Sequence, residues 1–416
     1  MSRYATDTVR KDNDQPAMPI GMPALVKMAF DGIDLAPVWN GLVARVNENP
    51  DDAGALIDLS TIALVQGRPH DRVSLQEMAL KVQRIYRQQP VGDASKSLRV
   101  LAFLSPGVLM DNMPVEFLLE QSNVSLDMVY VVPGLPLPDP LPSHDVALVC
   151  ASESRENQAL LRELSALLAS WPRPVVNRPD RIARLTRVGT WELLKSVPEI
   201  IIPVQVQVEA SRLKQIAEGE VAIEAVLAGR GFPIIARPVD SHAGEGLAKL
   251  SSRAEVVDYL GDRREDEFCI APFIDYRSAD GLFRKYRIAL IDGHPYAVHM
   301  AVSQHWMVHY LNADMKDSAA KRAEEARFMA DFDNDFAVRH KSALDAIGTL
   351  TGLEYLPFDC GETSDGKLLV FETGTNMIVH SMDPVDLFPY KPPQMAKVFG
   401  AFQAMLRKCS GQGSGQ

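Results

Sequence analysis

The stretch LPFDCGETSDGKLLVFE, residues 356–372, does most to decide the fold. Two short apolar runs each end in an acid, Asp359 and Glu372, and the turn Ser364-Asp365-Gly366 separates them. An Asp-Gly pair between apolar runs is typical of a β-hairpin, so the two carboxylates should lie side by side at one end of a sheet. Magnesium binds through one or two carboxylates together with substrate phosphates, which makes both acids candidate metal ligands. The alternative is two solvated acids at strand ends.

A basic strand precedes this hairpin in the chain. In RKYRIAL, residues 284–290, Lys285 and Arg287 alternate with Tyr286 and Ile288. Successive side chains of a strand point to opposite faces, so both cations should share one face. A face bordering bound phosphates would use both charges. Otherwise the strand simply has a solvated basic face.

A glycine-bearing loop follows another apolar strand in FPIIARPVDSHAGEGL, residues 232–247. Arg237 ends the strand, and Gly244 and Gly246 allow backbone N–H groups to approach phosphate oxygens closely. The sequence therefore predicts a phosphate-binding loop. An ordinary glycine turn beside a surface arginine is the competing interpretation.

The order of these features resembles the ATP-grasp superfamily, whose members include carboxylate–amine ligases of the glutathione synthetase and D-alanine–D-alanine ligase type. The resemblance covers most of residues 97–405. It implies an ATP-grasp clamp that uses ATP and Mg²⁺, with the catalytic residues Arg287 and Arg237. In that pattern the remaining ATP-binding residues are Arg187 at the first phosphate-binding lysine position, Ser241, His242, Gly244 and Gly246 in the lid loop, Ala271, Phe273 and Ile274 at the adenine hinge, Asp275 or Asp280 at the ribose, and Lys285.

The resemblance also implies the metal ligands Asp359 and Glu372. The third ligand of the family, an asparagine two residues after the glutamate, is Gly374 here, and either Asn376 or water would replace it. Both phosphate-binding lysine positions carry arginine, which keeps the charge but changes reach and hydrogen-bond geometry. These departures leave the number of metal ions open.

The segment HMAVSQHWMVHYLN, residues 299–312, concentrates histidines and aromatic residues after the basic strand. In the family this region borders the acceptor substrate. The alternatives are a core segment with satisfied histidines and a zinc site, although the spacing fits no familiar zinc ligand set. We expect substrate contacts from Ser303, His305, His309, Asn312 and His380, with His299 as a further candidate.

These residues predict a ligase that joins a carboxylate to an amine through an acyl phosphate and releases ADP and phosphate. A catalytically weak ATP-binding regulatory or scaffold protein is one alternative. A small-molecule phosphotransferase, whose phosphorylated product is final, is another.

The composition excludes several classes of protein. The chain has 416 residues, 46% of them hydrophobic, and a formal net charge of −11. An acidic chain gains little from phosphate neutralisation, so we expect small-molecule carboxylate and amine substrates and no nucleic-acid partner. The polar N-terminus lacks the apolar core of a signal peptide, no apolar run would span a membrane, and scattered cysteines indicate free thiols in the cytoplasm. A homodimer is left open.

The chain changes character along its length, which predicts an α+β fold with a small parallel α/β part. One helix is expected to run from about Ser74 to Arg87, and Ile200–Val208 is expected to form one strand. The predicted parts are a disordered arm at 1–20, a helical, weakly tetratricopeptide-like extension at 21–96, a parallel α/β domain at 97–177, the ATP-grasp domain at 178–409 with its lid at about 190–273, and a disordered tail at 410–416.

Overall fold

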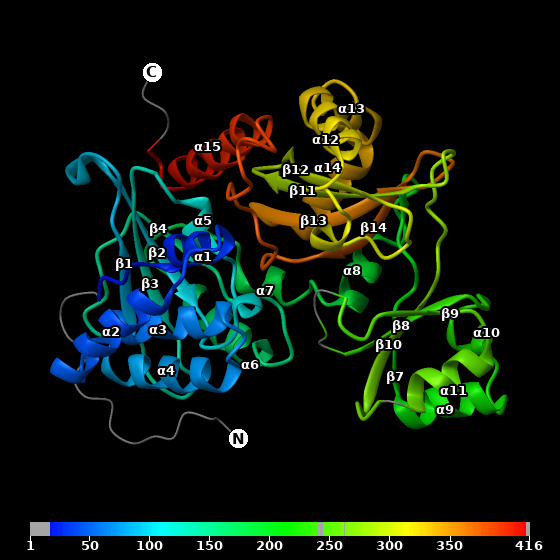
Figure 1. Ribbon diagram of the computed structural model, residues 1–416, viewed down its shortest axis with the longest axis horizontal. Helices are drawn as coiled ribbons and strands as arrows, with labels where there is room; N and C mark the ends of the chain where they lie inside the picture. The colour runs from blue at the N-terminus through cyan, green and yellow to red at the C-terminus, as the bar shows by residue number, and fades with distance from the viewer. Residues whose placement is uncertain (1–16, 240, 242–243, 262, 413–416) are drawn as a thin grey trace. The chain divides into compact units, whose positions relative to one another are not determined.

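The computed structural model describes residues 17–239, 241, 244–261 and 263–412. Contacts divide the chain into two compact units. Unit 1 contains the chain up to Ala183, Leu353–Tyr355 and the chain from Thr375 onward, whereas unit 2 contains Arg184–Gly352 and Leu356–Gly374. The chain thus passes from unit 1 into unit 2 twice and returns to unit 1 each time. Helices and sheets alternate in both units, and the predicted α+β class is confirmed (Figure 1).

Unit 1 is built on a five-stranded sheet in the order β1-β3-β2-β4-β5. Strand β2 pairs in parallel with β3 and β4, and β4 with β5, which confirms the predicted parallel sheet. Strand β1 adds an antiparallel edge next to β3 that the sequence pattern did not predict. The strands are β1 (Ile85–Gln88), β2 (Leu98–Leu104), β3 (Val124–Tyr130), β4 (Val146–Val149) and β5 (Val175–Val176).

Helices α1 to α4 precede this sheet and pack around an apolar cluster that includes Leu25, Leu42 and Ile62. The prediction of a helix continuing to Arg87 is wrong at its end, because the side-chain oxygen of Gln83 accepts the backbone N–H groups of Arg84 and Ile85 and stops the helix. The helices of unit 1 are α1 (Met22–Phe30), α2 (Ala36–Glu48), α3 (Ala53–Val65), α4 (Pro69–Val82), α5 (Val115–Leu118), α6 (Gln158–Leu168), α7 (Pro179–Ile182) and α15 (Lys391–Cys409), with 3₁₀ turns at Ala94–Lys96 and Leu109–Asp111.

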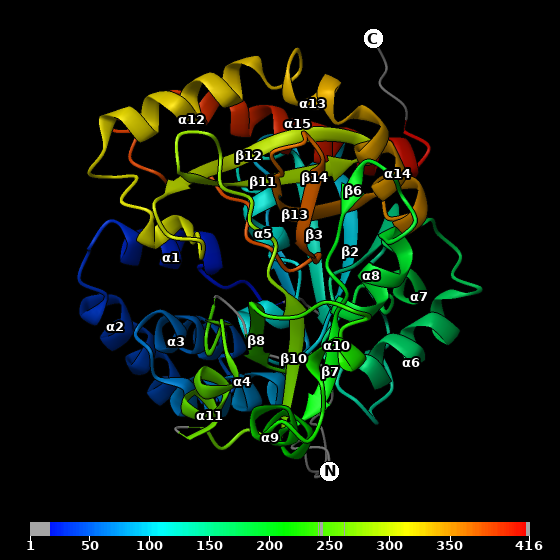
Figure 2. The same ribbon diagram turned by 90° about the vertical axis from the view of Figure 1, so that its right-hand side faces the viewer.

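Unit 2 contains a five-stranded sheet in the order β12-β11-β13-β14-β6. Strands β11 and β12 form a hairpin, whose two-residue turn has positive φ at both Asp292 (50°) and Gly293 (79°), as a type I′ turn requires. Figures 1 and 2 show α12 to α14 on one side of this sheet. Its elements are β6 (Ile200–Ile201), β11 (Phe283–Ile291), β12 (His294–Ser303), β13 (Tyr355–Glu362), β14 (Leu368–Thr373), α8 (Arg187–Leu194), α12 (Ala319–Asp331), α13 (Phe336–Arg339) and α14 (Lys341–Thr351), with a 3₁₀ turn at Tyr310–Asn312.

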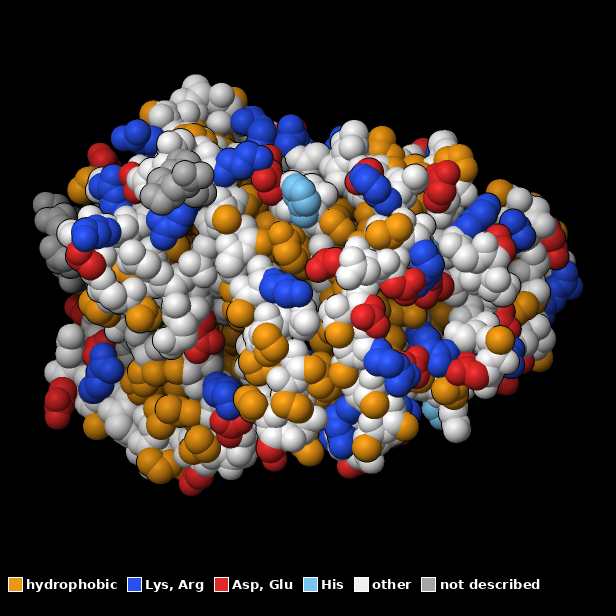
Figure 3. Space-filling model, turned by 90° about the horizontal axis from the view of Figure 1, so that it is seen from above, with side chains coloured by type: hydrophobic (Ala, Val, Ile, Leu, Met, Phe, Trp, Pro, Cys, Tyr) orange, Lys and Arg blue, Asp and Glu red, His pale blue; other side chains and the backbone are white. Residues whose placement is uncertain are grey.

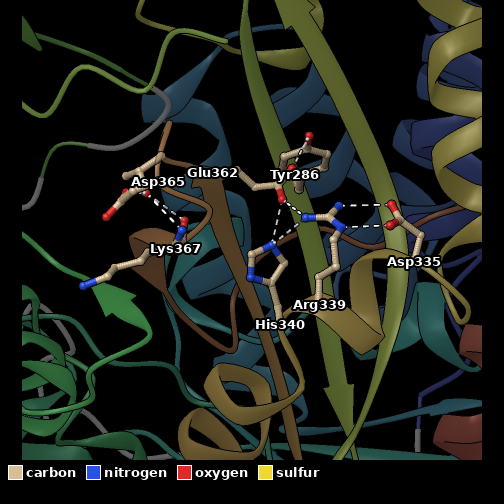
Figure 4. A network of polar contacts seen from close by, with 8 residues as sticks. Tyr286, Asp335, Arg339, His340, Glu362, Asp365 and Lys367 are labelled. Carbon is tan, nitrogen blue, oxygen red and sulfur yellow. Dashed lines mark hydrogen bonds and ion pairs between the residues drawn. The ribbon is translucent and has the colours of Figure 1, made fainter. Parts of the chain in front are cut away.

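A polar network fixes the helical side of this sheet (Figure 4). Glu362 on β13 accepts hydrogen bonds from the Tyr286 hydroxyl at 3.0 Å and from Arg339, and its oxygen lies 2.8 Å from Nε2 of His340. Arg339 also forms a bidentate ion pair with Asp335. Because Tyr286 points to this side, its neighbours on β11 point to the other.

The second sheet of unit 2 has the order β7-β10-β8-β9. Helices α9 and α11 cover it (Figure 1), and its core includes Leu213, Ile234 and Phe268. The single strand expected at 200–208 is wrong, because the chain is extended without strand pairing around Pro203 and gives β6 to one sheet and β7 to the other. The elements are β7 (Val206–Glu209), β8 (Ile234–Pro238), β9 (Ala248–Leu250), β10 (Glu267–Pro272), α9 (Ala210–Glu218), α10 (Ile223–Val226) and α11 (Arg253–Gly261).

The surface carries both signs of charge, and basic and acidic side chains are interspersed over the face in Figure 3. Within the described ranges, no helix is at once long enough and apolar enough to cross a bilayer. All four cysteines are free thiols, and Cys150, Cys269 and Cys360 are buried.

Candidate functional site

Asp359 and Glu372 lie directly opposite each other on the antiparallel pair β13–β14. This register confirms the predicted placement of the two acids. They differ in exposure, because the Asp359 side chain is fully buried whereas that of Glu372 is 37% exposed. A β-bulge follows Asp359 in the register of this hairpin.

Two cations of strand β11 bind the buried acid. Lys285 Nζ lies 2.6 Å from Asp359 Oδ2. Arg287 donates from Nε to Oδ1 at 2.7 Å and from Nη2 to Oδ2 at 3.0 Å, a bidentate geometry that carboxylates and phosphates both accept. The predicted common face of Lys285 and Arg287 is confirmed by these contacts.

A third cation, Arg187, binds Glu372 with Nη2 3.0 Å from Oε2. Arg187 begins helix α8, and the Thr186 side chain caps this helix by accepting the backbone N–H of Gly189 at 2.8 Å. The hydroxyls of Thr190 and Thr373 lie 2.9 Å apart and join α8 to β14. The start of the helix is therefore held beside the end of the acid-bearing strand.

Arg237 ends strand β8 and is the fourth cation of the group. Its Nε donates to the Ser241 hydroxyl at 3.0 Å, and its Nη2 donates to the Ser241 carbonyl oxygen. Burial, and after it the charge of Arg187, lowers the pKa of Arg237 to about 10, while Glu372 opposes the shift. These influences put Arg237 within electrostatic reach of the Arg187–Glu372 pair.

The cations keep both acids ionised. Burial by itself would raise the pKa of Asp359, but Arg287 and Lys285 outweigh burial and hold it well below its usual value. Burial also disfavours ionised Glu372, yet Arg187 and Lys285 lower its pKa although Asp359 repels it. We call these six side chains the charge cluster: Arg187, Arg237, Lys285, Arg287, Asp359 and Glu372.

The glycine loop after β8 requires glycine at position 246. Gly246 has φ of 64°, and a Cβ atom there would lie 2.6 Å from Cδ of Pro238. Gly244 also has positive φ, 81°. His242 lies outside the described residues, so its predicted contact with ATP stays a prediction.

The predicted adenine hinge follows strand β10. Ala271 is buried and pairs with Ile235 of β8. Beyond it, Lys249 Nζ lies 3.8 Å from the centre of the Phe273 ring, and Trp306 packs edge-on against that ring at 5.8 Å. Ile274 is half-buried. Lys249 and Trp306 were missed by the sequence analysis, since nothing in their local pattern connects them with the hinge.

The two candidate ribose acids are occupied by neighbouring arginines. Asp275 pairs with Arg277 at 2.6 Å. Asp280 pairs with Arg284, whose Nη2 lies 2.7 Å from Oδ2. Neither acid belongs to the charge cluster, and a role at the ribose stays a prediction for both.

The histidine-rich segment is ordered by its own polar contacts. The Ser303 hydroxyl accepts the N–H of His305 at 3.0 Å, and Asn312 Oδ1 accepts the N–H of His309 at 3.1 Å. Burial lowers the pKa of His309, and Lys285 and Arg287 lower it further, which places its imidazole near the charge cluster. His299 also acts on Asp359 electrostatically, and its ring centre lies 4.7 Å from that of Tyr310.

Two predicted site residues belong to unit 1. Asn376 donates from Nδ2 to the carbonyl oxygen of Met110 at 2.7 Å, and His380 Nδ1 accepts the backbone N–H of Met382 at 3.1 Å. Across the described ranges, no three His, Cys, Asp or Glu side chains gather as they would around a metal ion. Asp359 and Glu372 are therefore a two-carboxylate set.

No family model and no curated protein match the chain. Among solved structures, D-alanine–D-alanine ligase from Bacillus anthracis, crystallised with ATP, shows a TM-score of 0.43 and 14% identity over 75% of this chain and 99% of that one. A likeness of this degree leaves the activity to be decided by the side chains.

Proposed function

We propose that unit 2 binds ATP with Mg²⁺ at the charge cluster and that the chain is an ATP-dependent carboxylate–amine ligase of the ATP-grasp type. The observation that supports this most is the composition of the cluster, in which four cations accompany two carboxylates. The excess of positive charge suits a polyphosphate, and the paired carboxylates suit a hard divalent cation.

The carboxylates fit Mg²⁺ by charge and by chemistry. Both offer hard oxygen donors, and the lowered pKa of each keeps it ionised at neutral pH. Asp359 and Glu372 would hold the ion, which would neutralise charge on the phosphates. The missing third protein ligand does not exclude this, because Mg²⁺ commonly keeps several water molecules.

Arg287 and Lys285 have exchangeable partners in this proposal. Both are bound to Asp359 in this structure, and a phosphate offers the same oxygen geometry as a carboxylate. We expect them to turn from Asp359 toward the γ-phosphate when the metal–nucleotide complex occupies the acids. The protein would thereby avoid leaving either buried cations or buried acids without partners.

The chemistry proceeds in two displacements. An oxygen of the substrate carboxylate attacks the γ-phosphorus, the bond to the bridging oxygen breaks, and acyl phosphate and ADP form. The nitrogen of the amine then attacks the acyl carbon, the C–O bond to phosphate breaks, and the amide forms as the nitrogen loses a proton. Arg237 and Arg287 neutralise the charge that develops on the phosphoryl oxygens.

A phosphate-release screen tests this function. The full chain is incubated with ATP, Mg²⁺ and pools of carboxylic acids and amines, and we expect phosphate release that needs both an acid and an amine. Mass analysis of the product separates an amide from a phosphoester, which would instead indicate a phosphotransferase.

Non-catalytic ATP binding is the second candidate. The internal neutralisation of Asp359 by Lys285 and Arg287, together with glycine at position 374, favours it. ATP binding measured by calorimetry without phosphate release from any pool would support this candidate over the ligase.

A further inference from the structure

Unit 1 contains a second pair of acids that the proposed function does not use. Asp58 on α3 is 1% exposed, and its oxygens accept the backbone N–H groups of Ile20 at 2.7 Å and Gly21 at 3.1 Å. Glu116 on α5 accepts the N–H of Met22 at 3.1 Å. The two acids thus bind consecutive residues of the segment leading into α1.

Within the described part of the chain, neither acid has a cationic partner. Among the described residues, no ion pair includes Asp58 or Glu116. Arg45 attracts Asp58 from a distance, but it is itself paired with Asp52 at 2.9 Å, and Asp52 repels Asp58. Asp58 in turn repels Glu116. Two carboxylates of this kind are costly to ionise without a compensating charge.

A small cavity of about 20 Å³ is lined by both acids. A cavity of about 10–15 Å³ is already large enough for one water molecule, so this one accommodates a single water-sized species. A larger cavity of about 50 Å³ adjoins it, because both are lined by Met22, Ile57, Thr61, Glu116 and Tyr130.

Tyr86 of β1 supplies an independent sign of a missing ligand. Its side chain is 1% exposed and lines the small cavity, yet its hydroxyl has no hydrogen-bond partner among the residues that the structure describes. Burial raises its pKa, and Tyr130 and Asp58 raise it further, which places the hydroxyl within electrostatic reach of Asp58. A buried hydroxyl that makes no hydrogen bond is unusual and indicates that something binds it.

We propose that this cavity binds a water-sized monovalent cation, K⁺ or NH₄⁺, held by the carboxylates of Asp58 and Glu116 and by the hydroxyl oxygen of Tyr86. Such an ion supplies the positive charge that the acids lack and gives the hydroxyl a partner. Mg²⁺ fits less well, because it demands six ligands at about 2.0–2.1 Å and retains its water reluctantly, for which this cavity has no room.

The ion would hold the segment 17–22 against three elements of unit 1. Ala17 forms a β-bridge with Tyr86, and its N–H donates to the Ile85 carbonyl oxygen at 2.9 Å. Three ligands of the ion therefore come from α3, α5 and β1, and all three elements contact the segment 17–22. Binding of the cation should therefore raise the free energy of unfolding of unit 1, and it should do so without any nucleotide.

Thermal unfolding of the full chain tests the site. Chlorides of K⁺, NH₄⁺, Na⁺ and N-methylglucamine are compared at constant ionic strength, without ATP. We expect K⁺ or NH₄⁺ to raise the midpoint of unit 1 by about 2–4 °C over N-methylglucamine, whose cation is too large for the cavity. Equal midpoints in all salts would show that only water or a proton occupies the cavity, and would overturn the proposal.

Substitutions inside and outside the cavity test whether the K⁺-dependent shift of the midpoint arises at this site. Glu116→Gln removes one charge but keeps an oxygen for Met22, and Tyr86→Phe removes only the hydroxyl. We expect both to lose most of the K⁺-dependent shift, whereas Glu120→Gln, at an exposed acid just after α5, keeps it. A shift that persists in both cavity variants would place the cation elsewhere. If Glu116→Gln fails to fold, Tyr86→Phe and the salt series still decide.

Discussion

The protein contains two pairs of carboxylates, each with one buried and one partly exposed acid, and their electrostatic surroundings are opposite. In unit 2, cations surround Asp359 and Glu372 and lower the pKa of both. In unit 1, burial raises the pKa of Asp58 to about 6 and that of Glu116 to about 7. Burial disfavours the ionised form of all four, so the difference comes from neighbouring charge. Only in unit 2 do basic side chains keep the acids ionised, as the proposed site for ATP and Mg²⁺ requires.

The largest effect is expected from Asp359→Asn. The substitution leaves Lys285 and Arg287, which are 19% and 18% exposed, without a counter-charge. Removing one partner of a buried ion pair typically costs about 3–5 kcal/mol, and we expect unit 2 to lose a comparable part of its free energy of unfolding. ATP turnover should fall to background, as measured by phosphate release.

Asp345→Asn on α14 is the matched control. It removes the same charge from an exposed pair with Lys341, and its stability should stay within about 0.5 kcal/mol of wild type. Turnover at a near wild-type rate in Asp359→Asn would show that this acid does not bind the metal.

The second-largest expected effect is a difference between the two pairs in how the free energy of unfolding depends on pH. A raised folded-state pKa means that the folded state holds its proton more tightly than the unfolded state, so stability falls as pH rises toward that pKa. Between about pH 5 and pH 8, unit 1 should lose about 4 kcal/mol, whereas Asp359 and Glu372 stay ionised throughout. Glu116→Gln should flatten this slope.

Urea unfolding followed by tryptophan fluorescence measures the slope. Trp39 and Trp171 belong to unit 1 and Trp191 and Trp306 to unit 2, so a Trp191→Phe, Trp306→Phe background reports unit 1 alone. A stability of unit 1 that rises over this pH range would contradict the raised pKa values. Saturating K⁺ should make the slope shallower if the cation site exists.

A smaller effect on stability is expected from Glu372→Gln, because its pair with Arg187 is partly exposed and such pairs contribute about 1 kcal/mol or less. Instead, the Mg²⁺ concentration that gives half-maximal phosphate release should rise by about tenfold or more. Glu192→Gln, on the exposed side of α8, controls for the loss of charge. An unchanged Mg²⁺ requirement would remove Glu372 from the metal site.

The two pairs also differ in how far the sequence reveals them. The register of Asp359 against Glu372 depends on one short hairpin, and the common face of Lys285 and Arg287 depends on strand alternation, so both could be predicted from local pattern. The partner of Glu372 lies 185 residues away in the chain. Only the resemblance placed Arg187 in the site, and no local pattern would have paired it with Glu372.

One feature of the sequence points to the pair in unit 1, although no site was predicted from it. Asp58 is an isolated acid within the apolar helix AGALIDLSTIALV, which predicts either a partner or a strained burial. Its neighbour Glu116 comes from a distant helix, and Tyr86 comes from a strand that was expected to be helical. Tertiary contacts alone bring these groups together, because the side chain of Gln83 ends α4 and starts β1.

The smallest effect tests whether charge also acts through space on His309. Burial, then Lys285 and Arg287, lower the pKa of this imidazole, and Asp359 and Glu372 oppose them. Lys285→Met removes one cation and keeps the bidentate pair of Arg287 with Asp359, so the pKa of His309 should rise, by less than about one unit. NMR titration measures it, with His309→Asn to assign the signal. Lys249→Met removes a cation that faces Phe273 instead and should leave the signal unmoved. Equal shifts of the His309 pKa in both variants would mean that this pKa depends only on the net charge of unit 2. His309 would then not lie beside the charge cluster.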